Sequence, residues 1–193
     1  MEDYLIAHRP GDATDLPETK ALVKKALTEM GYAPQDCGKC GVLALAGGKR
    51  PGKTILLRGD MDALPIQEES GEEFASEIPG RMHGCGHDMH TAMMLGAAKL
   101  LKAHEDEIEG TVKLEFQPAE EIFQGSLDML KNGLLENPKV DAAVMFHVLA
   151  GIKMINNQNM TGKKNCTDDQ KKFTFADCKS LSGCQTQEIK STQ

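Results

Sequence analysis

The sequence of 193 residues predicts an α/β fold, in which helices pack against a β-sheet. First, apolar residues recur at helical spacing in two segments, near residues 15–30 and 91–102. Second, short apolar or alternating segments, typical of strands, occur around these helices. Third, some of the strand-like segments end in acidic residues or histidine, and sites in open α/β sheets lie outside the carboxyl ends of the strands.

The first helix is expected to begin near Asp15 and to end before Gly31, a common stop signal. Asp15 is a candidate N-cap, and Glu18 follows it by three residues, as in a capping box. Pro17 suits the first turn, where a missing N–H costs little. The residues expected on one apolar face are Leu22, Ala26 and Met30.

Two strands are expected at residues 42–46 and 54–58, and their connection fits a phosphate-loop motif. Residues 47–54, GGKRPGKT, match the pattern G-x-x-x-x-G-K-T. Such a loop needs a helix directly after the Thr, because the helix N-terminus receives the phosphate. The sequence after Thr54 is strand-like and is then broken by Pro65. We therefore interpret the connection as a basic hairpin turn and disfavour nucleotide binding.

Cys37 and Cys40 form a C-x-x-C motif. A redox pair would be expected before a helix, whose N-terminus lowers the pKa of a thiol. Because the residues that follow are strand-like, we interpret the motif as a turn with incidental cysteines. A zinc site shared with the cysteines of residues 151–193 stays open as an alternative, although the spacing does not support it.

The segment 81–92, RMHGCGHDMHTA, concentrates side chains of the types that bind metals. Gly84 and Gly86 flank its cysteine, and glycine lets another group approach the backbone closely. A helix is expected from about Thr91 to Lys102, and its first half is apolar almost all round, which predicts burial. A buried cysteine beside surface histidines would explain a lone Cys or His, but so dense a group favours a metal site. The ligand-type residues are His83, Cys85, His87, Asp88 and His90.

Two further strands and a short helix are expected after this segment. Residues 111–116 alternate between apolar residues and the polar Lys113 and Glu115, which predicts a strand with one buried and one exposed face. A short helix is expected at residues 126–132, and an apolar strand at residues 142–146.

Three of the expected strands end in groups that can bind metal or move protons. Taken singly, these groups would be interpreted as a polar strand end, a solvated acidic loop and a satisfied histidine. Their occurrence at three strand ends instead favours one site, with residues 81–92 as its fourth wall. Asp60 and Asp62 share one strand face and are candidates for orienting a ligand histidine. The three groups are Asp60 with Asp62, Glu120 with Glu121, and His147.

Composition and charge exclude some classes of partner. The net charge of −7 argues against nucleic acid, which needs a basic face. No run reaches the ~18 apolar residues of a membrane span, and the start, MEDYLIAHRP, lacks the pattern of a secretory signal. We therefore expect a cytoplasmic protein with no membrane partner. Residues 151–193 hold seven lysines and four acidic residues, so we expect a domain over residues 1–150 and a polar, basic, poorly ordered tail after it.

Three motifs together resemble the M20 metallopeptidases, in the branch of the hippurate hydrolases and N-acyl-amino-acid amidohydrolases. The resemblance runs from about Asp15 to Gly151, and the motifs occur in order. They are RGDMDALP at residues 58–65, MHGCGHDMHTA at residues 82–92 and FQPAEE at residues 116–121.

The resemblance implies a fold, a site and a reaction. The fold would be an incomplete zinc-peptidase-like catalytic domain, a mixed sheet flanked by helices. Cys85, His87, Glu121 and His147 would be metal ligands, and Glu120 would be the general base. A complete site of this family holds two divalent ions, such as zinc or manganese. The reaction would be hydrolysis of the amide bond of N-acyl amino acids or related small amides.

The chain also departs from this family. Members are about twice as long, and their second half carries a small lid and dimerisation domain and a last metal-binding histidine. Residues 151–193 contain no histidine. We therefore expect impaired hydrolysis by this chain, and a homodimer only for the complete family fold. The alternative is a catalytically inactive, metal-binding fragment.

Overall fold

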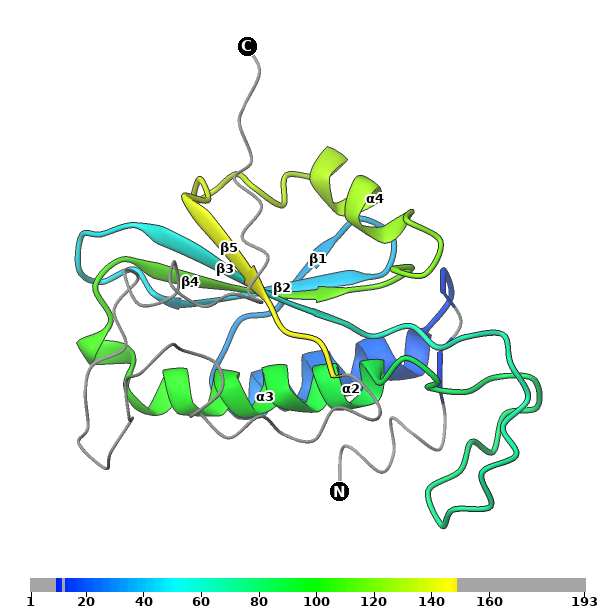
Figure 1. Ribbon diagram of the computed structural model, residues 1–193. Helices are drawn as coiled ribbons and strands as arrows, with labels where there is room; N and C mark the ends of the chain where they lie inside the picture. Colours follow the sequence, from blue (N-terminus) through cyan, green and yellow to red (C-terminus); the bar gives the residue numbers. More distant parts are fainter. Residues whose placement is uncertain (1–9, 12, 149–193) are drawn as a thin grey trace, which may run out of the picture. The chain divides into compact units, whose positions relative to one another are not determined.

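Figure 1 shows the computed structural model, which describes residues 10–11 and 13–148. The boundary expected near Gly151 and the tail at residues 151–193 lie outside the described residues. In this part of the chain the helices are α2 (Pro17–Glu29), α3 (His87–Ala103), α4 (Gly125–Lys131) and a short 3-10 helix, η1 (Glu105–Glu107). The strands are β1 (Gln35–Cys37), β2 (Gly41–Gly47), β3 (Thr54–Asp60), β4 (Thr111–Gln117) and β5 (Ala142–Met145).

The five strands form one mixed sheet in the order β1-β2-β4-β3-β5, which confirms the predicted α/β class. Helices α2 and α3 cover one face of this sheet, and α4 lies on the other (Figure 1). Strand β3 is parallel to both β4 and β5, whereas β2 is antiparallel to β1 and β4. Because parallel strands end at the same edge of a sheet, the segments that follow β3, β4 and β5 meet there.

The connection between β2 and β3 is not the hairpin turn that we expected. Strand β4 lies between the two strands, so they do not pair with each other. The connection instead crosses the start of β4, where Gly110 donates to the Arg50 carbonyl and Thr111 donates to the Lys53 carbonyl. A Cβ atom at Gly110 would lie 2.1 Å from the Lys53 oxygen, so this approach requires glycine. As expected, a strand and not a helix follows Thr54, which excludes the geometry of a phosphate loop.

Helix α2 begins at Pro17, and its N-cap is Leu16 rather than Asp15. No side chain caps the helix, because the buried Leu16 occupies the cap position and packs in the core. The buried face also differs from the predicted one, since Val23 and Leu27 are fully buried whereas Leu22 is only half-buried. The helix stops before Gly31 as predicted, and this glycine has a φ of 86°.

Helix α3 begins at His87, four residues before the predicted start. Its first turn therefore belongs to the segment 81–92, which holds the side chains of metal-binding types. Its first half is not buried all round as expected. Met89 and Met93 remain exposed, because among the described residues only the opposite face of the helix packs on the sheet. No helix in the described residues is long and apolar enough to span a membrane.

Strand β4 is buried on both faces, which contradicts the prediction that one face is exposed. Lys113 and Glu115 are both buried on the face towards α4, and the segment after α4 covers Lys113. The Lys113 ammonium donates to the carbonyls of Leu134, Glu136 and Pro138 at 2.7–3.0 Å. These bonds replace the water that an exposed lysine would contact.

The Glu115 carboxyl is only 2% exposed, and one of its oxygens has no hydrogen-bond partner. Burial raises its pKa to about 7, against the opposing effect of Arg58 on β3. The folded protein therefore holds a proton at Glu115 more tightly than the unfolded chain does. The resulting stabilisation is complete below the unfolded pKa and is lost as the pH rises through 7.

Replacing Glu115 by Gln should remove this pH dependence of stability, because Gln has the shape of Glu and cannot ionise. Between pH 5 and 8 the free energy of unfolding of the wild type should fall by up to about 3 kcal/mol more than that of Glu115→Gln. Urea unfolding at several pH values measures both curves. The exposed Glu73→Gln is the control and should follow the wild type. If the free energies of unfolding of wild type and Glu115→Gln changed in parallel with pH, the raised pKa of Glu115 would be contradicted.

Candidate metal centre

The structure brings all the predicted site residues to the edge of the sheet where β3, β4 and β5 end. Cys85 lies in the loop before α3, and His87 is the first residue of that helix. Glu120 and Glu121 lie in the turn after β4, and His147 follows β5. The predicted ligands and base form two groups of potential ligand atoms, and within each group all these atoms lie within 4.8 Å of one another. The groups are Cys85 with His87 and His147, and His87 with Glu120 and Glu121.

His87 is buried and presents one ring nitrogen to the site. Its Nδ1 donates to the backbone carbonyl of Asp62 at 2.8 Å, which fixes the ring. Its Nε2 is buried without a hydrogen-bond partner and lies 3.5 Å from Oε1 of Glu121. That carboxylate oxygen is also buried without a hydrogen-bond partner. Two such facing atoms are costly in a protein interior unless a proton or a metal ion lies between them.

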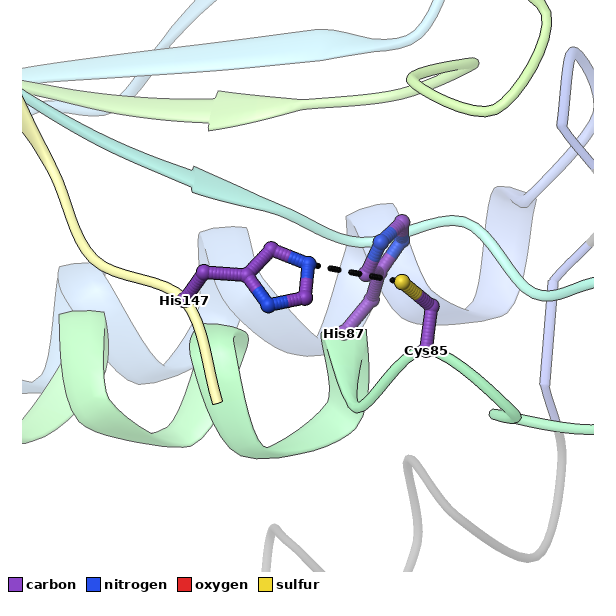
Figure 2. A group of neighbouring side chains, drawn as sticks. All are labelled: Cys85, His87 and His147. Atoms are coloured by element: carbon purple, nitrogen blue, oxygen red, sulfur yellow. Dashed lines mark hydrogen bonds between the residues drawn. The ribbon is translucent and has the colours of Figure 1, made fainter. Parts of the chain in front are cut away.

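Cys85 and His147 face each other across the site, with His87 beside them (Figure 2). The Nδ1 of His147 donates to the carbonyl of Val148 at 2.5 Å, so its Nε2 is the acceptor nitrogen. This Nε2 lies 3.4 Å from the Cys85 sulfur. In both histidines one nitrogen is held by a backbone carbonyl and the other faces the site, which is the usual arrangement of metal-binding histidines.

Asp62 forms hydrogen bonds with two segments of the site, the start of α3 and the turn after β4. Its side-chain oxygens accept hydrogen bonds from the backbone N–H groups of Glu120, at 3.0 Å, and Glu121, at 3.4 Å. Its backbone carbonyl holds His87. Asp62 lies beyond the end of β3, not on the strand as expected, and contacts residues of both predicted metal-binding segments.

The electrostatics of the site favour a cation. Burial and the nearby Glu121 carboxylate raise the pKa of the Cys85 thiol to about 11. Burial opposes protonation of His87, but the Asp62 and Asp60 carboxylates outweigh it and raise its pKa. A divalent ion would offset this negative charge and favour the thiolate. One sulfur, two imidazole nitrogens and a carboxylate suit zinc or a similar ion, so the donor set fits a metal.

Arg58 is a site residue that the sequence analysis overlooked. Its guanidinium lies 3.1 Å from the Asp60 carboxylate and 3.8 Å from that of Glu120, and it donates to the Gln117 side chain at 2.9 Å. The available signal was its spacing, because Arg58 shares a strand face with Asp60. Among the described residues, neither His83 nor Asp88 belongs to a group that could hold an ion, whereas His90 does.

The chain is similar to several known proteins. The model of peptidase family M20/M25/M40 matches residues 56–162, more than half of the chain. IAA-amino acid hydrolase ILR1-like 5 of Arabidopsis thaliana is 48% identical over 145 residues, 73% of this chain and 32% of that protein. N-acetyl-L-cysteine deacetylase of Bacillus subtilis is 45% identical over 131 residues, 67% of this chain and 31% of that protein.

A solved structure described as an M20-family peptidase is also similar to this chain. The YXEP protein of Bacillus subtilis, described as a dinuclear metal-binding peptidase of the M20 family, superposes with a TM-score of 0.73 at 38% identity. The match covers 77% of this chain and 41% of that one. The chain spans about a third of the length of the two curated relatives. On the extent of the family match, the chain belongs to peptidase family M20/M25/M40.

Proposed function

We propose that this chain carries the metal centre of an amidohydrolase that cleaves the amide bond of N-acyl amino acids or related small amides. One observation carries the proposal: the buried, unpartnered His87 Nε2 and Glu121 Oε1 face each other beside the Cys85 sulfur and His147 Nε2. The names of the two curated relatives, an IAA-amino acid hydrolase and an N-acetyl-L-cysteine deacetylase, support the substrate class.

The proposed ligands are Cys85, His87, Glu121 and His147, and the ions are divalent, such as zinc or manganese. The dinuclear metal binding of the solved relative supports two ions in a complete site. When bound, a divalent ion lowers the pKa of water and polarises an acyl oxygen. The proposed setting is the cytoplasm, and the proposed partner is a small substrate.

The proposed general base is Glu120. Its carboxylate belongs to the same group as His87 and Glu121, so it lies beside the proposed ligands without being needed as one. Its backbone is held by Asp62, and Arg58 lies 3.8 Å from its side chain. From this position Glu120 would take a proton from the attacking water and deliver it to the leaving amine nitrogen.

Removing and restoring the metal tests this proposal. The chain, stripped by a chelator and reloaded with zinc or manganese, should bind one or two ions and hydrolyse an N-acetyl amino acid only when loaded. At a free metal concentration about 100 times the Kd, binding should stabilise the fold by about 2.7 kcal/mol. Metal analysis, thermal unfolding and release of the free amino acid measure these effects.

A matched pair of cysteine variants is the control. Cys85→Ala should lose the metal, whereas Cys40→Ala, which removes a buried thiol bonded to the Thr14 carbonyl, should keep it. A wild type that binds metal without any turnover would favour the alternative, an inactive metal-binding fragment. Negligible metal content, unchanged in Cys85→Ala, would refute both.

A further inference from the structure

His90 is buried beside the proposed metal centre, and both of its ring nitrogens are engaged. Its Nδ1 lies 2.5 Å from a carboxylate oxygen of Asp60, and its Nε2 lies 2.9 Å from the backbone nitrogen of Val148. An amide N–H can only donate, so Nε2 is the acceptor. The ring proton therefore sits on Nδ1 and points at Asp60.

Asp60 is a fixed partner for this histidine. Its other carboxylate oxygen lies 3.1 Å from the Arg58 guanidinium, and its backbone carbonyl accepts a hydrogen bond from the Thr91 hydroxyl. Asp60 is only 2% exposed. The orientation of the His90 ring is therefore set by strand β3, and Nε2 is directed towards the segment that follows β5.

Val148 connects His90 to the proposed ligand His147. Its N–H donates to His90, and its carbonyl accepts the Nδ1–H of His147. Both backbone groups of Val148 are thus used to hold histidines. The two rings also contact each other edge to face, with centroids 4.6 Å apart. The Val148 side chain lies so close to Gly86 that a Cβ there would be 2.3 Å from it.

We propose that His90 is a positioning residue that holds the Val148 peptide, so that His147 turns its Nε2 towards Cys85 and His87. His90 does not bind the ion itself, although Asp60, His87 and His90 form a compact group. To become a ligand, His90 would have to give up the Val148 amide or the Asp60 carboxylate. This inference rests on the proposed metal centre, because it assigns His147 as a ligand.

Nitrogen-15 NMR of the histidine rings in the full chain tests the assignment directly. In the metal-free protein, His90 should be neutral, with its proton on Nδ1. On addition of zinc, the Nε2 signals of His87 and His147 should shift, whereas the two ring signals of His90 should keep their tautomer pattern. Single substitutions of the histidines assign the signals. A His90 proton on Nε2, or zinc coordination by His90, would overturn the inference.

Two substitutions of His90 separate positioning from ligation and from a purely structural role. His90→Gln places an amide oxygen where Nε2 accepts the Val148 N–H, whereas His90→Asn can only replace the donor to Asp60. Zinc affinity, measured by chelator competition, should stay within about threefold in the Gln variant and fall about 10- to 100-fold in the Asn variant. Equal losses would indicate a ligand, and no loss in either variant would indicate a structural residue.

The outcomes distinguish this inference from the proposed function. A wild type that binds no zinc refutes both the metal centre and the positioning role. A wild type that binds zinc while His90→Gln and His90→Asn behave alike refutes the positioning role alone. Thermal unfolding of each variant establishes whether it is folded, and if one is not, the tautomer and zinc response of the wild type decide.

Discussion

Replacing Glu120 by Gln is expected to lower the rate of amide hydrolysis at saturating substrate by about a hundredfold to ten-thousandfold. The amide has the shape of the carboxylate but cannot take a proton from the attacking water. Metal content should be unchanged, because none of the proposed ligands is altered. Turnover of an N-acetyl amino acid and metal analysis of the same sample measure the two effects separately.

The neighbouring residue provides the matched control. Glu121→Gln changes a carboxylate of the same turn, whose backbone N–H is also held by Asp62. Because Glu121 is a proposed ligand, this variant should lose metal and turnover together. Loss of metal in Glu120→Gln, or full turnover in that variant, would contradict the assignment of Glu120 as the base.

Replacing Lys113 by Met is expected to destabilise the fold by about 3 kcal/mol or more, because three carbonyls lose a charged donor. All three carbonyls lie in the segment between α4 and β5, so loss of these hydrogen bonds should destabilise that segment. Methionine has a similar length, so the deleted hydrogen bonds, and not a cavity, should dominate. Urea unfolding measures the change.

An exposed lysine serves as the control for this substitution. Lys53 lies directly before β3, and its side chain is exposed. Lys53→Met should change the free energy of unfolding by less than about 0.5 kcal/mol. If Lys113→Met were no more destabilising than Lys53→Met, the three hydrogen bonds would contribute nothing net to stability.

The sequence could predict four of the five strands, all but the short β1, because apolar and alternating patterns are local. The polar groups that follow the ends of β3, β4 and β5 by a few residues fall at one edge of the sheet once the three strands are parallel. The roles of Cys85, His87, Glu120, Glu121 and His147 rest on the family resemblance and stay predictions, although the structure brings these residues together.

The remaining features depend on contacts between distant segments. Alternation of Lys113 and Glu115 with apolar residues is the same for a strand facing water and for one covered on that face, so their burial could not be predicted. The order of the strands could not be predicted either, because a short connection such as that between β2 and β3 usually joins neighbouring strands. Strand β4 separates β2 from β3 by an exception to that tendency.

This insertion of β4 has a consequence for synthesis of the protein. As the nascent chain emerges, β2 and β3 each have an open edge that is later paired with residues 111–117. The full set of proposed ligands cannot assemble until β5 has also joined the sheet, because His147 follows β5. Pairing of such distant segments is slow and leaves strand edges exposed to aggregation in the meantime. Binding of an ion by the full set of ligands would therefore occur late in folding and would indicate that the sheet is complete.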